Sequence, residues 1–375
     1  MLIVTTTHDS PLTTHEMSFL LYGANGYTGQ LIAEMSAASG LKPILAGRNE
    51  EKIRALAEQY GFEYRIFDLN DPAAVDKGLE GISVALHTAG PFIHTARPMM
   101  EACLRNRVHY LDITGEIDVF EMAHSFDTAA REAGILLMSG AGFDVVPTDC
   151  AALYLKNKLP DAIHLRLAFA SIGGGLSHGT ALTMAEGLGQ PGAERRNGRI
   201  VAVRLGKHTW TLPADDRTVF TMSIPWGDVS TAWYSTGIPN IITFTQTNPR
   251  SHRMLNFQFL FNWLLRTEFM KNRLRNRIHS RPAGPSAKRR AKAKSIVWGE
   301  ASNAAGTKAS VRLTLPEGYT LTALTSLLIV QKVLAGNAPK GFQTPAMAYG
   351  ADLIMEVDGV IREEGLGVEV KWARD

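Results

Sequence analysis

Three glycines near the start of the chain have a spacing that could bring a phosphate group against bare main chain. Within residues 19–29 a short apolar run ends in Gly23, Gly26 and Gly29, and an amphipathic segment follows. This order predicts a strand, a tight turn and a helix whose N-terminus faces a dinucleotide pyrophosphate. A glycine-rich turn without a ligand is the alternative. The candidate cofactor-binding residues of this loop are Gly23, Asn25, Gly26, Tyr27, Thr28 and Gly29.

The second predicted strand, residues 43–46, leads into Gly47, Arg48 and Asn49. An NAD-type site usually has Asp or Glu at this point, where the carboxylate binds the ribose hydroxyls. A guanidinium instead suits a 2′-phosphate. Arg48 therefore favours NADP(H) over NAD(H), the alternative being a solvated surface charge. Asn49 is predicted to cap the next helix, and it is kept as a second candidate for cofactor binding.

The loop after the fourth predicted strand supplies the candidates for the nicotinamide end of the cofactor. They are Ala89, Gly90, Pro91 and Phe92. An ordinary Gly-Pro turn is the alternative interpretation of this loop. Hydride transfer needs no protein nucleophile, because the protein only orients the reactants, excludes water and supplies a proton nearby.

Two side chains are candidates for the catalytic proton. His178 follows the glycines at 173–175 and precedes an apolar helix, so it could donate a proton or have a structural role. Asp144 follows the sixth predicted strand and could orient the substrate, or it could cap a helix after Pro147 together with Asp149. The histidines show no metal-site spacing, and we expect no metal.

The first half of the chain alternates strands and helices. The predicted strands are residues 18–22, 43–46, 63–67, 82–87, 109–112 and 135–139. This alternation of strands and helices predicts an α/β fold with a Rossmann-type doubly wound parallel sheet. We expect residues 1–16 to be a disordered extension and 17–148 to be the NAD(P)-binding domain.

Beyond residue 148 the pattern changes to half-exposed strands, at 199–212 and 311–315, and to helices at 180–188, 253–278 and 319–335. It predicts a second, α+β domain over residues 149–375, with a mixed or antiparallel sheet, for substrate binding and oligomerisation. A helix at 343–358 is expected to pack back on the first domain, and 281–291 is the best candidate for a loop.

Charge and composition limit the classes of partner. The net charge is +3, but residues 271–294 contain ten Lys or Arg and no Asp or Glu. This segment is either a solvated surface or a weak contact with a carrier domain or an anionic membrane surface; we expect no nucleic-acid partner. Two cysteines form no disulfide framework, and no signal peptide is apparent, which predicts a cytoplasmic protein.

With these residues placed, the chain resembles the saccharopine dehydrogenase-like oxidoreductase family, in the bacterial branch that includes trans-acting enoyl reductases. The matching motifs are residues 23–29, 46–48, 89–92, 109–116, 142–149, 177–180, 284–285, 298–301 and 343–346. The resemblance implies a nicotinamide-binding first domain, an active site between the domains and a homodimer. His178 departs from the family pattern, in which a small residue follows the serine.

These observations predict an NADPH-dependent oxidoreductase. It would reduce a C=C (enoyl) or C=N bond of a hydrophobic or acyl substrate, free or carrier-bound, between the two domains. The preference for C=C comes from the resemblance alone. The alternative from another class is a non-catalytic NADP(H)-binding sensor or scaffold.

Overall fold

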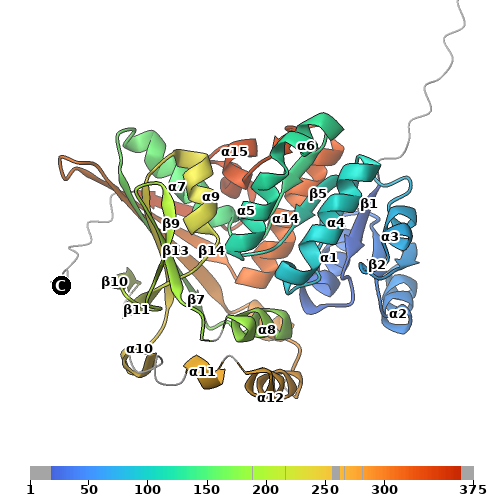
Figure 1. The fold of residues 1–375 in the computed structure, drawn as a ribbon, viewed down its shortest axis with the longest axis horizontal. Helices are drawn as coiled ribbons and strands as arrows, with labels where there is room; N and C mark the ends of the chain where they lie inside the picture. Colours follow the sequence, from blue (N-terminus) through green and yellow to red (C-terminus); the bar gives the residue numbers. More distant parts are fainter. Residues whose placement is uncertain are drawn as a thin grey trace, which may run out of the picture.

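The computed structural model describes residues 18–187, 189–215, 217–255, 262–265, 267–280 and 282–364. The predicted extension at 1–16 lies outside these residues. Two sheets organise the chain, each with helices against it (Figure 1). Among the described residues, no helix combines the length and apolar character that a membrane crossing requires.

The first sheet is parallel throughout, with the order β15-β6-β5-β4-β1-β2-β3. Strands β1, β2 and β4 are buried on both faces, which is why they consist of small and apolar residues apart from His87 at the end of β4. The strands are β1 (Phe19–Tyr22), β2 (Ile44–Gly47), β3 (Tyr64–Ile66), β4 (Val84–His87), β5 (His109–Asp112), β6 (Leu136–Met138) and β15 (Gly341–Phe342). The predicted Rossmann-type sheet is confirmed, and β1 lies at its switch point between β4 and β2.

The helices of the first sheet are α1 (Tyr27–Ala38), α2 (Glu50–Tyr60), α3 (Pro72–Gly78), α4 (Phe92–Asn106), α5 (Ile117–Ser125) and α6 (Asp127–Ala133). Local capping fixes where two of them begin. Asn49 Oδ1 accepts a hydrogen bond from the Lys52 N–H (3.0 Å) at the start of α2. Asp71 accepts from two N–H groups at the start of α3, where Pro72 is the first residue.

The second sheet is mixed, as predicted. Its order is β10-β11-β12-β7-β13-β14-β16, with β8 against β12 and β9 against β8. The β12–β7 pair is parallel and the other pairs are antiparallel. The strands are β7 (His164–Ile172), β8 (Gly192–Arg196), β9 (Arg199–Val203), β10 (Thr209–Ala214), β11 (Arg217–Ile224), β12 (Asn240–Gln246), β13 (Lys294–Ser302), β14 (Lys308–Pro316) and β16 (Ile361–Glu364).

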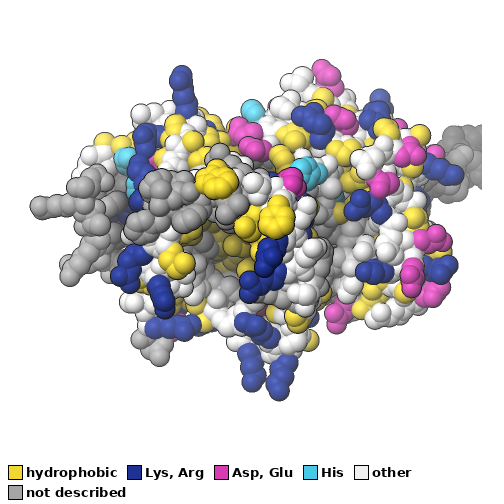
Figure 2. Space-filling view, turned by 60° about the horizontal axis from the view of Figure 1, so that its bottom comes forward, with side chains coloured by type: hydrophobic (Ala, Val, Ile, Leu, Met, Phe, Trp, Pro, Cys, Tyr) yellow, Lys and Arg dark blue, Asp and Glu magenta, His cyan; other side chains and the backbone are white. Residues whose placement is uncertain are grey.

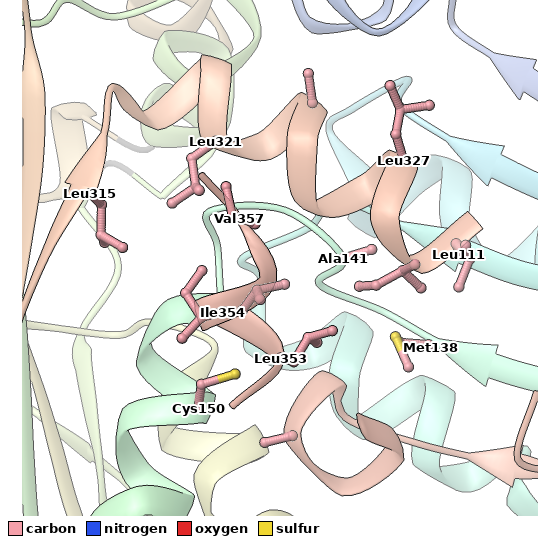
Figure 3. Packing of buried hydrophobic residues seen from close by; sticks show 14 of the residues in the cluster. Leu111, Met138, Ala141, Cys150, Leu315, Leu321, Leu327, Leu353, Ile354 and Val357 are labelled. Atoms are coloured by element: carbon pink, nitrogen blue, oxygen red, sulfur yellow. The ribbon is translucent and has the colours of Figure 1, made fainter. Parts of the chain in front are cut away.

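One hydrophobic core joins the two sheets. Helices α7 (Val146–Lys158), α9 (Asp228–Thr236) and α14 (Gly318–Leu334) lie between them, and α14 packs against α1. Figure 3 shows Leu111 and Met138 of the first sheet and Leu315 of the second in the same cluster. The chain then returns to the first sheet through β15, which pairs with β6. Cys103 and Cys150 are buried free thiols.

Three predicted elements are wrong in detail. The predicted helix at 253–278 overlaps α10 (Pro249–Leu255), α11 (Asn262–Leu265) and α12 (Glu268–His279), and residues 256–261 within it lie outside the described residues. It is wrong at Thr267, whose hydroxyl caps the start of α12. The loop at 281–291 contains α13 (Ala287–Arg290), capped by Ser286. The helix at 343–358 is α15 (Pro345–Tyr349) followed by a 3-10 turn, interrupted at Gly350 (φ 85°).

Candidate functional site

The loop between β1 and α1 has the conformation that its glycines permit. Gly23 has φ 86°, and a Cβ there would lie 2.8 Å from the backbone nitrogen of Ala89. A Cβ on Gly29 would overlap the carbonyl oxygen of Gly23. The three glycines therefore allow a left-handed turn, close packing of the β4 loop and close packing of the helix on its own strand.

The N-terminus of α1 is open to an anion. Its N-cap is Gly26, so no side chain caps the helix, and its first turn contains no acidic residue. The N–H groups of Tyr27, Thr28 and Gly29 have no acceptor within the helix, because they belong to its first turn. They mark the positive end of the helix dipole. A Cβ on Gly26 would contact only the Gly23 carbonyl oxygen (3.2 Å), so the approach to these N–H groups is clear.

The loop after β4 lies against this turn. Thr88 donates from its N–H and its hydroxyl to the Tyr22 carbonyl (2.8 and 2.9 Å), which holds the loop beside Gly23. The N–H groups of Phe92 and Ile93 donate to the Glu116 carboxylate (2.9 and 2.8 Å). Glu116 thus caps the start of α4. Of the four predicted residues, Gly90 is the most exposed, whereas the Phe92 side chain is buried.

Arg48 stands directly after β2, as the sequence predicts. Its side chain is 72% exposed, and its guanidinium lies 3.8 Å from the Asp68 carboxylate. The side chain of Asn49 is already occupied as the cap of α2. Of this pair, Arg48 is the one with a charge accessible to a ligand.

Tyr319, on the first turn of α14, connects this site to α8 (His178–Glu186). Its hydroxyl accepts a hydrogen bond from the Ser177 N–H (2.6 Å) and lies 2.9 Å from the Thr180 hydroxyl. Its ring packs edge-on against Tyr27, with 5.0 Å between centroids. His178 lies between Ser177 and Thr180 in the sequence, and its backbone N–H donates to the Ala283 carbonyl (2.9 Å). Burial raises the pKa of Tyr319, so the hydroxyl keeps its proton.

Asp144 lies in an aromatic environment. A Cβ on Gly115 would meet Trp226 at 3.1 Å and the Asp144 side chain at 3.2 Å. Phe143 and Trp226 both pack against Phe169. Burial raises the pKa of Asp144 to about 7, and its charge in turn raises the pKa of Tyr319. No side chain caps α7, so the alternative role of Asp144 as a helix cap is not what the structure shows.

Comparison with known proteins agrees with this geometry. Residues 19–138 match the family described as the saccharopine dehydrogenase NADP binding domain. The chain is 27% identical over 202 residues to a saccharopine dehydrogenase-like oxidoreductase of Rattus norvegicus, covering 47% of each chain. Over about half of its length, the chain is thus similar to saccharopine dehydrogenase-like oxidoreductases. The span that matches the NADP binding domain contains the three glycines and Arg48.

Two further relatives extend the comparison. The chain is 31% identical over 189 residues to a putative trans-acting enoyl reductase of Mycobacterium tuberculosis, covering 46% of this chain and 45% of that one. An apo saccharopine dehydrogenase (L-Glu forming) of Saccharomyces cerevisiae has the same fold, with a TM-score of 0.66 at 13% identity over 93% of this chain and 100% of that one. The matches span about half the length of the curated relatives.

Sequence reasoning missed two residues near this site. Arg290 donates to the hydroxyl of Tyr27, the first residue of α1 (2.9 Å), and to the Pro285 carbonyl (3.1 Å). Tyr319 is the second, through its contacts with Tyr27 and Ser177. Arg290 belongs to the basic segment that the sequence singled out only for its charge. Gly284 in the matching motif 284–285 was the available signal, because a Cβ there would lie 2.5 Å from the Tyr27 ring.

Proposed function

We propose that this protein is an NADPH-dependent oxidoreductase that reduces a C=C bond of a hydrophobic or acyl substrate bound between the two sheets. The observation that carries the proposal is the open N-terminus of α1 behind Gly23 and Gly26, within the span that matches an NADP-binding domain. The similarity to trans-acting enoyl reductases supports the C=C assignment. Reduction of a C=N bond is the alternative chemistry at the same site.

The residues around α1 fit a phosphorylated dinucleotide. The first-turn N–H groups would bind the pyrophosphate, and Gly26 leaves the approach to them clear because it carries no side chain. Arg48 would bind the 2′-phosphate. Arg290 would approach the pyrophosphate from the second half of the chain, since its guanidinium lies beside the first residue of α1. No carboxylate of the described residues pairs with Arg290.

Bound NADPH supplies the hydride. The chain's own contribution is to hold the substrate carbon in place and to provide a proton. Asp144 suits the second task, because with a pKa of about 7 its carboxyl group is partly protonated at neutral pH. Phe143, Phe169 and Trp226 form an aromatic cluster, and Trp226 and the Asp144 side chain both lie against Gly115, so apolar surface suited to an acyl chain is close to the carboxyl group. Tyr319 would hold the α8 N-terminus, and with it His178, against the same region.

The experiment is a measurement of NADPH oxidation with the full chain. The panel contains enoyl thioesters of increasing chain length, 2-oxo acids with amines, and quinones. We expect turnover with enoyl thioesters and a fall in KM as the acyl chain lengthens. Turnover only with oxo acid and amine would favour C=N reduction. Tight NADPH binding without turnover of any substrate would favour the non-catalytic sensor.

A further inference from the structure

One edge of the molecule carries several exposed hydrophobic side chains. Helices α10, α11 and α12 lie along this edge, and α12 packs against α8 (Figure 1). Half of the large hydrophobic side chains that are exposed among the described residues belong to α8, the loop before it and these three helices. They are Leu176, Met184, Met254, Trp263 and Phe269, each between 57% and 71% exposed. Single exposed residues of this kind are common, but a cluster marks an interaction surface.

The same edge is strongly basic. Residues 249–294 contain thirteen Lys or Arg and a single acidic residue, Glu268. On α12, Phe269, Arg273 and Arg277 are spaced by four and therefore share one face of the helix, and all three are exposed. Figure 2 shows basic and hydrophobic side chains together on this side of the molecule. A partner that complements this edge must therefore have both negative charge and an apolar region.

We propose that α8 and α10–α12 form a face that binds the anionic surface of a phospholipid bilayer. Aromatic and aliphatic side chains would enter the boundary between head groups and acyl chains, while Arg273 and Arg277 pair with the phosphates. Several short helices along one edge present an extended surface, which fits a bilayer better than the single groove that a partner helix would need.

The position of this face explains what it could achieve. The N-terminus of α8 is bonded to Tyr319, whose ring contacts the α1 loop, so the face adjoins the proposed site. An enzyme bound to the bilayer surface through this face would have its proposed site close to hydrophobic substrates that are dissolved in the bilayer. The lipid contact itself does not depend on the redox assignment, and it is tested without any measurement of turnover.

The test is co-sedimentation of the full chain with vesicles of phosphatidylcholine alone and of phosphatidylcholine with 30% phosphatidylglycerol. We expect binding to the anionic vesicles that weakens with added salt, and little binding to the neutral ones. Trp263→Ser with Phe269→Ser, and separately Arg273→Glu with Arg277→Glu, should each reduce binding about tenfold or more.

Matched controls carry equal changes elsewhere on the surface. Tyr64→Ser with Ile361→Ser, and Lys42→Glu with Arg199→Glu, alter exposed residues of other elements and should leave vesicle binding unchanged. Circular dichroism and thermal unfolding, measured for every variant, report whether it is folded. Absence of binding to anionic vesicles overturns the proposal. That result is expected if the face binds an acidic carrier protein instead of a bilayer. Equal loss in the control variants also overturns the proposal.

Discussion

Arg48 is the residue on which the choice between NADPH and NADH depends in the proposed site. It follows β2 with its charge accessible, and its nearby acidic partner Asp68 is 3.8 Å away. Arg48→Ala should weaken NADPH about tenfold, because one charge-assisted pair with the 2′-phosphate is lost, and leave NADH almost unchanged. Calorimetric titration of both nucleotides measures this. Arg54→Ala, on the surface of α2, is the control. Equal losses for the two nucleotides would contradict the assignment.

Arg290 should act on the part of the cofactor that NADPH and NADH share. Its guanidinium is bonded to the hydroxyl of Tyr27, the first residue of α1, so in the proposed site it adds positive charge near the helix end that would hold the pyrophosphate. Arg290→Ala should therefore weaken both nucleotides by a similar factor, about tenfold. Lys288→Ala changes an exposed charge on the same short helix and serves as the control. Wild-type affinity for both nucleotides in the Arg290 variant would rule out the pyrophosphate contact.

Asp144 should govern the pH dependence of turnover. Burial raises the pKa of this carboxyl group to about 7, so it holds its proton below that pH and loses it above. If Asp144 donates the proton, kcat falls as the pH rises through about 7. Asp144→Asn should lower kcat about a hundredfold and remove this limb of the profile. A profile that is unchanged in Asp144→Asn, but altered in His178→Ala, would transfer the role to the imidazole.

At the scale of elements, the N-terminus of α1 differs from the helices that a side chain caps. Gly26 occupies the N-cap in an extended conformation that Asp also adopts readily. Gly26→Asp should therefore stabilise the fold by about 0.5 kcal/mol, because Asp caps a helix better than Gly does. The same carboxylate would repel the pyrophosphate, so NADPH affinity should fall at least tenfold.

This variant separates the two roles of the helix end. Thermal unfolding and nucleotide titration are measured together, with Thr267→Asp at the N-cap of α12 as the control that should leave affinity intact. Unchanged affinity in Gly26→Asp would show that the pyrophosphate does not bind at α1.

Across the whole molecule, buried acids between the two sheets couple stability to pH. Asp228, at the start of α9, is fully buried, and no group of the described residues meets hydrogen-bond geometry with either carboxylate oxygen. Burial raises the pKa of Asp228 to about 8, which the nearby Thr148 hydroxyl offsets only in part. Asp149 in α7 is affected in the same way, with a pKa of about 6.

Because these carboxyl groups have a higher pKa in the folded than in the unfolded chain, the folded state binds more protons. Their contribution to stability is complete below about pH 4 and is lost as the pH rises through about 8. Asp228→Asn cannot ionise, so at pH 8.5 it should raise the free energy of unfolding by about 2 kcal/mol. Denaturant titrations at pH 6 and pH 8.5 measure this. An equal effect at both pH values would mean that ionisation is not the cause.

The chain's own local patterns determined the first half of the fold and much of the cofactor loop. Apolar runs that end in Gly23 or Arg48, and caps such as Asn49, depend on neighbours a few residues away, so spacing alone predicts them. The break at Thr267 was missed because an apolar helical pattern continues through it. The Thr267 hydroxyl caps α12, so the break has a local cause that the spacing of apolar residues does not reveal.

Tertiary structure alone decided how the site is completed. The Tyr27–Pro285 hydrogen bond joins residues 258 positions apart, and the Ser177–Tyr319 bond spans 142 positions. The sequence determined the phosphate loop, the order of strands and helices, and the basic segment, because each depends on local periodicity and turn chemistry. It could not determine that Arg290 and Tyr319 meet this loop. Such contacts arise only when the core between the two sheets brings distant elements together.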